Sequence, residues 1–223
     1  MPVKVCFEKI VALKVPILCV LLLSLIGCES AYYGAMEKVG FHKRDILVDR
    51  VEDVRDAQVD VKEQFSSALD RFTQELNFDG GDLQDVYNNL SSEYADSLSE
   101  AEELSGNIDK VESVAEALFS EWSEELTQYS SASMRRQSAT QLKETKAHYK
   151  KMHASMLAAE SKMEPVLENM YDKVLFLKHN LNARAIASLK SEFGSLKRDI
   201  GRLIADMEKS IQAADKFMAT MAH

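Results

Sequence analysis

The chain is poor in residues that interrupt helices. Its 223 residues include 3 prolines and 8 glycines, and aromatic residues make up 8% of the composition. Hydrophobic residues make up 46% and charged residues 28%, so the chain can bury a core and is not disordered by composition. Scarce helix breakers together with abundant alanine, glutamate, leucine, lysine and serine favour long helices over sheets.

Cysteine is also scarce, and all three cysteines lie in the first 28 residues. Three lysines precede an uncharged stretch, residues 15–26, which would span about 18 Å as a helix. A membrane-spanning helix needs about 20 apolar residues, so this stretch is typical of the hydrophobic region of a signal peptide. We predict that residues 1–27 are an export signal; the alternatives are an uncleaved anchor or a chance apolar start.

The apolar stretch ends in Leu25-Ile26-Gly27-Cys28, which resembles the lipobox of bacterial lipoproteins. By that resemblance, cleavage after Gly27 leaves Cys28 as the lipid-bearing first residue, and residues 28–36 form a short tether. Cleavage would also remove Cys6 and Cys19, so an intramolecular disulfide would be impossible. Glu29 follows the cysteine, where an aspartate favours retention in the inner membrane of enterobacteria. We therefore expect an outer-membrane lipoprotein facing the periplasm, with the inner membrane as the alternative.

The chain is acidic, with 36 acidic against 27 basic residues and a formal net charge of −9. The predicted signal contains three lysines and one glutamate, so the remaining body is more acidic still. A polyanion is a poor partner for nucleic acid or anionic headgroups, because binding to phosphates depends on an excess of lysine and arginine. We expect the lipid on Cys28, and no basic face, to hold the protein to a membrane.

Apolar residues recur at steps of three and four along residues 37–223, as in heptads. The first stripe runs from Leu47 to Leu76 with one polar member, Gln58, which could specify the register of packing or face a wet end. We predict an all-α domain over residues 37–223: an elongated antiparallel bundle or coiled coil of three to four long helices. Heptads can also pair between chains, so a dimer is possible.

Breaks in the heptad pattern divide the domain into segments. We expect a turn at residues 77–81, a serine cap for the next helix at residues 130–133, and a turn with capping asparagines at residues 180–182. The heptad register of the apolar residues is the same before and after Gly106, so a bent but continuous helix is expected there. Pro165 predicts a kink, with a complete break as the second choice, and Ser161 with Glu164 resembles a capping box.

Two longer strings are distinctive rather than generally helical. Residues 28–51, beginning Cys-Glu-Ser-Ala-Tyr-Tyr-Gly, and residues 177–189, Leu-Lys-His-Asn-Leu-Asn-Ala-Arg-Ala-Ile-Ala-Ser-Leu, resemble the bacterial domain of unknown function 2959 family (DUF2959). Phe119-Ser-Glu-Trp122 and Lys162-Met-Glu-Pro-Val166 resemble it too. The resemblance covers essentially the whole predicted mature chain. It implies an uncharacterised envelope lipoprotein and supplies no activity, cofactor or catalytic residue.

The sequence lacks the common motifs of catalytic and cofactor sites. The sequence has no H-E-x-x-H, no Glu-x-x-His pair, no G-x-S-x-G string and no phosphate-binding G-x-x-x-x-G-K-[ST] loop. We therefore expect no catalytic site, metal, cofactor or nucleotide, and no enzyme. A weaker candidate is an interaction tip formed by His179, Asn180, Asn182 and Arg184, for which capping of a tight hairpin is the alternative.

These observations rank three functional hypotheses. The first is a lipid-anchored helical scaffold or interaction protein of the bacterial cell envelope, with a protein partner or self-association through its helices. The second is a periplasmic binding or chaperone-like module whose bundle opens to accept an apolar ligand. The third is an enzyme of unrecognised type, which would require a cleft with clustered, perturbed carboxylates or histidines.

Overall fold

The computed structural model of the chain describes residues 42–77 and 82–222. Its helices are α3 (Lys43–Leu76), α4 (Leu83–Glu125), α5 (Ala132–Glu160), α6 (Met163–His179) and α7 (Ala183–Met221). The all-α class is thus confirmed. The chain divides into two compact units, Met1–Ile46 and Leu47–His223, and the second is the helical unit described below. The predicted signal, residues 1–27, the acylated Cys28 and the tether, residues 28–36, lie outside the described residues.

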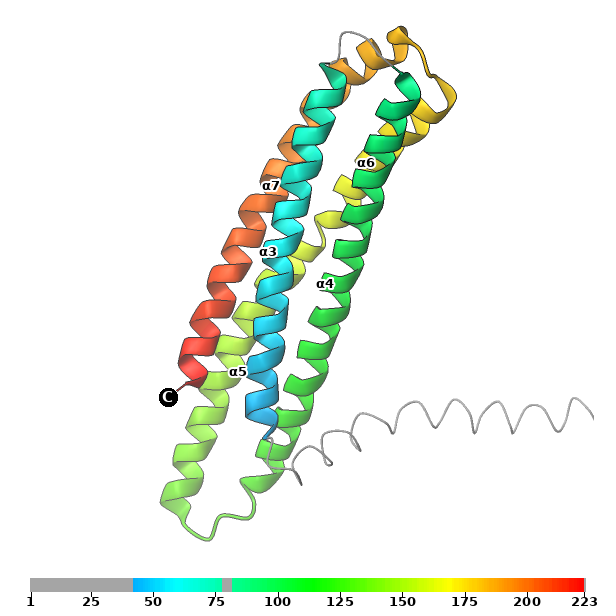
Figure 1. Cartoon of the computed structure of the whole chain (residues 1–223). Helices are drawn as coiled ribbons and strands as arrows, with labels where there is room; N and C mark the ends of the chain where they lie inside the picture. Colours follow the sequence, from blue (N-terminus) through cyan, green and yellow to red (C-terminus); the bar gives the residue numbers. More distant parts are fainter. Residues whose placement is uncertain (1–41, 78–81, 223) are drawn as a thin grey trace, which may run out of the picture. The chain divides into compact units, whose positions relative to one another are not determined.

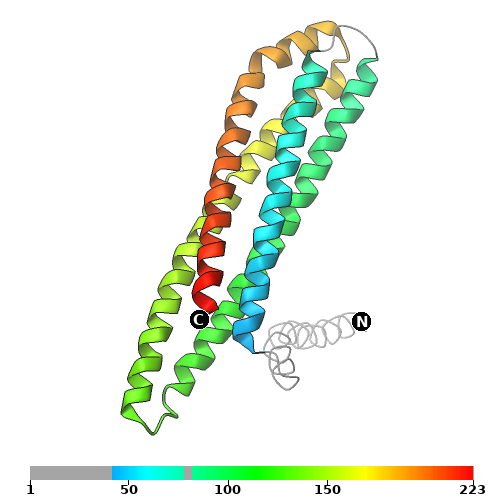
Figure 2. The same cartoon turned by 60° about the vertical axis from the view of Figure 1, so that its left-hand side comes forward.

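The Leu47–His223 unit is an up-and-down bundle with four arms (Figures 1 and 2). Helices α3, α4 and α7 are one arm each, and α5 followed by α6 makes the remaining arm. Helix α3 lies between α4 and α7: Gln64 Nε2 donates to Glu93 Oε2 of α4 at 3.2 Å, and Gln58 Nε2 donates to Ser210 Oγ of α7 at 2.8 Å. Both α4 and α7 also pack on α5 and α6. The bundle therefore closes on itself.

The core follows the predicted heptad stripes closely. Every member of the first stripe is at most 4% exposed: Leu47, Val51, Val54, Gln58, Val61, Phe65, Ala68, Phe72 and Leu76. Four such arms bury their apolar stripes against one another, which is what stabilises helices that have a single apolar face. The heptad spacing also continues to Tyr129 and Leu181, which it predicts to be buried, but these two residues are 37% and 39% exposed. Both lie beyond the last turn of a helix, in the connections, so no neighbouring arm covers them.

Side-chain caps begin three of the helices. Asp82 Oδ1 accepts from Gln84 N at 2.9 Å at the start of α4. Ser131 Oγ accepts from Met134 N at 3.4 Å before α5, and Asn182 Oδ1 accepts from Ala185 N at 3.1 Å before α7. These acceptors satisfy backbone donors that a helix leaves without partners in its first turn. The predicted serine cap and the Asn182 cap are confirmed.

The expectation at Pro165 was wrong in its first choice: the helix is broken and not merely kinked. Helix α5 ends at Glu160 and α6 begins at Met163. Pro165 has no N–H to donate to the Ser161 carbonyl and its ring crowds that carbonyl, so the regular hydrogen-bond pattern stops there. The capping box was also wrong. Ser161 Oγ donates back to Ala158 O at 3.1 Å, and the residue preceding α6 is Lys162, which makes no side-chain cap.

Gly106 lies in the interior of α4, which runs without interruption from Leu83 to Glu125. The predicted continuity of this helix is confirmed. A Cβ atom built at Gly106 would meet nothing within 4 Å, so no close approach requires glycine at this position.

Candidate functional site

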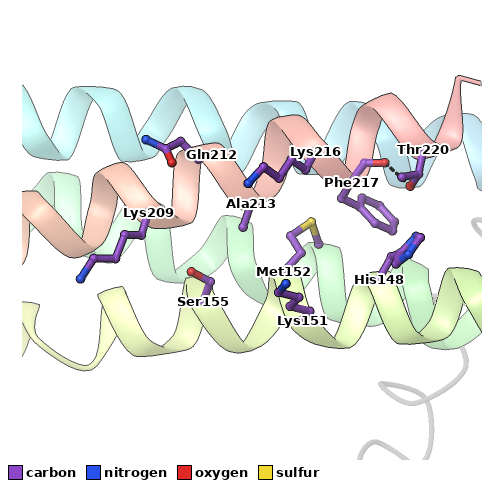
Figure 3. A pocket seen from close by; sticks show the side chains of 10 residues that line it. All are labelled: His148, Lys151, Met152, Ser155, Lys209, Gln212, Ala213, Lys216, Phe217 and Thr220. Atoms are coloured by element: carbon purple, nitrogen blue, oxygen red, sulfur yellow. Dashed lines mark hydrogen bonds between the residues drawn. The ribbon is translucent and has the colours of Figure 1, made fainter.

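A groove opens between α5 and α7 on the surface of the bundle and has a volume of about 470 Å³ (Figure 3). The α5 wall provides His148, Lys151, Met152 and Ser155, and the α7 wall provides Lys209, Gln212, Ala213, Lys216, Phe217 and Thr220. We call this the lysine groove. Its volume falls within the range typical of small-molecule sites, about 300–1,000 Å³.

Helical spacing explains why these side chains share one groove. On α7, Lys209 and Lys216 are seven residues apart, so both lie on the same side of the helix beside the buried Phe217. On α5, Lys151 and Ser155 are four apart and flank the buried Met152 in the same way. The packing of α5 against α7 then brings these two polar edges together over an apolar floor.

The groove carries positive charge on an acidic protein. Its lining contains three lysines and one histidine, and none of the described lining residues is a carboxylate. Lys209 Nζ is paired with Asp206 Oδ1 at 2.7 Å, and Asp206 also pairs with Lys162. Lys151 and Lys216 form no ion pair with any residue that the structure describes. These two ammonium groups, one on each wall, are therefore the charges available to a ligand.

The floor of the groove is apolar. Met152 is 1% exposed and Phe217 is 2% exposed. Figure 3 shows Met152 reaching from α5 toward Ala213 and Phe217 on α7. Thr220 Oγ1 donates to the Phe217 carbonyl at 2.7 Å, so this hydroxyl is engaged within α7. Polar walls over an apolar floor suit a ligand that combines an anionic group with an apolar part.

An aromatic cluster adjoins the groove behind Phe217. Tyr149 stacks on His153 with ring centroids 5.3 Å apart, and meets Phe119 and Phe217 edge-on at 5.4 and 6.2 Å. Tyr149 Oη and His153 Nε2 are buried and have no hydrogen-bond partner among the described residues. Burial raises the pKa of the Tyr149 phenol above its usual value, and the nearby carboxylates of Glu112 and Glu116 raise it further. This phenol is therefore held in its neutral form.

The predicted interaction tip lies in the turn between α6 and α7, away from the lysine groove. Asn180 Nδ2 donates to Phe176 O at 2.9 Å, and Asn182 caps α7. His179 and Arg184 are exposed. Both asparagines thus make hydrogen bonds at the helix ends, the chemistry on which the alternative interpretation of this segment rests.

The residues of the lysine groove were not found from the sequence. A heptad wheel would show Lys209, Ala213, Lys216 and Thr220 flanking one side of the last apolar stripe. The spacing of these four residues on α7 does not indicate which other helix lies opposite them. The partner wall lies some 60 residues earlier in the chain, and an overall charge of −9 conceals a local basic surface.

The described helices include neither a membrane span nor a metal-binding cluster. None of them is long and apolar enough to cross a membrane. No group of three or more histidines, cysteines, aspartates or glutamates within residues 42–77 and 82–222 is placed to hold a metal ion.

The fold defines the class of protein: an up-and-down, all-α bundle with four arms and a closed core. Comparison with protein families then places it. Residues 32–221 match the model described as a protein of unknown function (DUF2959), and the chain belongs to this family. No curated protein and no solved structure matches the chain.

Proposed function

We propose that this chain is a lipid-anchored, non-enzymatic interaction protein of the bacterial cell envelope that binds an anionic ligand in the lysine groove. The ligand chemistry is a phosphate or carboxylate group next to a short apolar part. The lipid on Cys28 holds the protein at the membrane, and the bundle presents the groove.

One observation carries the proposal: Lys151 of α5 and Lys216 of α7 line the same groove, over an apolar floor, and have no ion-pair partner among the described residues. Ammonium groups on opposite walls can contact one anion together, and an apolar floor adds burial energy of about 25 cal/mol per Å². In a chain of net charge −9, such a local concentration of lysine is not expected from composition alone.

The envelope location is supported by the sequence of the first 28 residues. A positive start, an uncharged stretch too short to span a bilayer and the Leu25-Ile26-Gly27-Cys28 string together favour export and acylation. Stable membrane attachment needs more than one acyl chain, which bacterial lipoproteins provide at this cysteine. The outer membrane facing the periplasm remains the favoured location because Glu29, and no aspartate, follows Cys28.

The closed core weighs against a bundle that opens to accept an apolar chain. Val51, Phe65 and Leu104 are 0% exposed, as are most residues of the stripe from Leu47 to Leu76. Opening the bundle would expose these side chains, each at a cost of about 1.5–3 kcal/mol. Binding at a preformed surface groove avoids that cost.

The test of the groove uses the mature lipoprotein in nanodiscs of neutral phosphatidylcholine. Binding of dihexanoyl phosphatidic acid and of inorganic phosphate is measured by calorimetry. The phosphatidic acid should bind to the wild type. Its affinity for the double variant Lys151→Glu with Lys216→Glu should be at least about tenfold lower. Binding of phosphate alone at equal strength would assign the groove to a free anion in place of a lipid-like one.

A matched variant separates the groove from overall charge. Lys143→Glu with Lys197→Glu removes one exposed lysine from α5 and one from α7, and neither residue lines the groove. It should bind like the wild type. Equal losses in both double variants, or no binding of either probe to the wild type, would refute the groove assignment.

The anchor is tested in cells with a radiolabelled fatty acid. The wild type should incorporate label and fractionate with membranes, whereas Cys28→Ser should remain unlabelled and unprocessed. Label retained in Cys28→Ser would show that the acylation site is elsewhere. This outcome is independent of the groove test, because Cys28 is not among its residues.

A further inference from the structure

A second groove of different character lies between α4 and the α5–α6 arm, with a volume of about 980 Å³. It extends along α4 from Tyr94 to Asp109, which is about 22 Å of helix. Across from α4 it passes over the break between α5 and α6, at Ser161. We call it the acidic groove.

Its floor and walls are apolar. Ala101, Met163 and Leu167 are buried beneath it, between 3% and 8% exposed. Leu157 and Tyr171 line it while remaining 43% and 46% exposed. Large apolar side chains at such exposure along a groove are a recognised feature of binding surfaces.

The rim carries one sign of charge. It is formed by five carboxylates and no lysine or arginine: Glu102, Asp109, Glu160, Glu164 and Glu168. None of the five forms an ion pair with a residue in the described part of the chain. Like charges along both sides of a low-dielectric groove raise the local concentration of cations and disfavour anionic partners.

The backbone of α4 is also uncovered here. Gly106 lines the groove, and a Cβ atom at this position would meet nothing within 4 Å. Ser161, in the break between α5 and α6, lines the groove together with this stretch of α4. The groove therefore spans the discontinuity in the neighbouring arm, beside Glu160 and Glu164 of the rim.

We propose that the acidic groove docks a basic amphipathic helix from a partner protein. About 15 helical residues match its length, an apolar stripe would cover the floor, and flanking lysines or arginines would pair with the rim. A helix is the fitting occupant because ridges of side chains on α4 and α6 accept another helix by ordinary helix packing. The site is separate from the lysine groove and does not depend on it.

The test uses the mature lipoprotein in neutral phosphatidylcholine nanodiscs and two fluorescent 15-residue peptides. Both have the same leucine stripe; one carries lysines on its polar face and the other glutamates. The lysine peptide should bind, and the glutamate peptide should bind at least about 100-fold more weakly. Equal binding of the two peptides would overturn the proposal.

Two variants of the protein locate the binding. The double variant Glu102→Lys with Glu164→Lys should reduce the affinity for the lysine peptide by at least about tenfold. The control, Asp60→Lys with Glu63→Lys, makes the same charge change on α3 and should keep most of the affinity. Gly106→Leu places a side chain over the groove and should also weaken binding by about tenfold. Gly201→Leu, on α7 and equally free of neighbours within 4 Å, is its control.

Each remaining outcome has a definite meaning. If the groove variants bind like the wild type, or if the controls lose as much affinity as the groove variants, the peptide binds elsewhere and the proposal is wrong. If the protein self-associates in sedimentation equilibrium and Glu102→Lys with Glu164→Lys abolishes that association, the occupant is a second copy and the partner-helix proposal is also overturned. Retained circular dichroism in all variants confirms that folding is not what changed.

Discussion

Gln58 of α3 and Ser210 of α7 meet in the centre of the bundle, both fully buried, with Gln58 Nε2 donating to Ser210 Oγ at 2.8 Å. The other amide atom, Gln58 Oε1, is buried without a partner among the described residues. A half-satisfied buried amide costs free energy that an apolar side chain would not. A polar pair at one heptad position can, however, fix the register of two helices, which is the role the sequence suggested for Gln58.

We therefore expect Gln58→Leu combined with Ser210→Ala to be at least as stable as the wild type in urea unfolding. Ser210→Ala alone should destabilise by about 1–3 kcal/mol, because it leaves the Gln58 amide without its one partner. A double variant that is less stable than the wild type would contradict this account. It would show that the pair contributes net stability.

Tyr149→Phe offers a test of the aromatic cluster. The variant keeps the contacts of the ring with Phe119 and Phe217 and removes a buried hydroxyl that has no partner among the described residues. At neutral pH it should be neutral or stabilising by about 1 kcal/mol. Tyr129→Phe, at an exposed position, is the control for loss of a tyrosine hydroxyl.

The same variant should change the alkaline pH dependence. The pKa of Tyr149 is raised in the folded state, first by burial and then by Glu112 and Glu116. In the unfolded chain the phenol ionises near its usual pKa of about 10. The unfolded state therefore releases a proton first as pH rises above about 10, and wild-type stability falls from there up to the folded-state pKa. Tyr149→Phe should lose less stability over this range; parallel decline of the two proteins would refute the explanation.

The heptad stripes could be predicted from the sequence because burial in a bundle follows helical period directly. Val51, Val54 and Phe65 are fully buried as expected, and no long-range information was needed to place them. The break after Glu160 was predicted as a kink. A proline indicates the loss of one helical hydrogen bond, but it does not indicate whether the helix bends or ends and begins again.

The two grooves depend on relations that no local pattern contains. Lys209 looks like Lys216 on a helical wheel, yet Asp206 neutralises the first and leaves the second available. The acidic groove arises where α4, continuous through Gly106, passes the break in the neighbouring arm. Both grooves depend on which helices are neighbours in the bundle. The heptad pattern alone does not specify these neighbours.

Mutations in the turn between α6 and α7 can distinguish a capping role from a recognition role. Asn182→Ala removes the acceptor for Ala185 N at the start of α7 and should cost about 1 kcal/mol of stability in thermal or urea unfolding. Arg184→Ala, at an exposed neighbouring position, should change stability by less than about 0.5 kcal/mol. If Asn182→Ala is neutral, its hydrogen bond does not support the helix and the recognition hypothesis for this turn gains weight.

Gly106 and Gly201 provide a final test of whether the bundle needs glycine in its helices. Both lie in helix interiors, on α4 and α7, and a Cβ atom at either would meet nothing within 4 Å. Alanine restricts the unfolded chain and favours the helix, so each Gly→Ala change should stabilise by about 0.5–1 kcal/mol. The two positions are on different arms, and their effects should add in the double variant. A loss of stability in Gly106→Ala alone would mean that α4 adopts, at this position, a conformation or a contact that requires glycine.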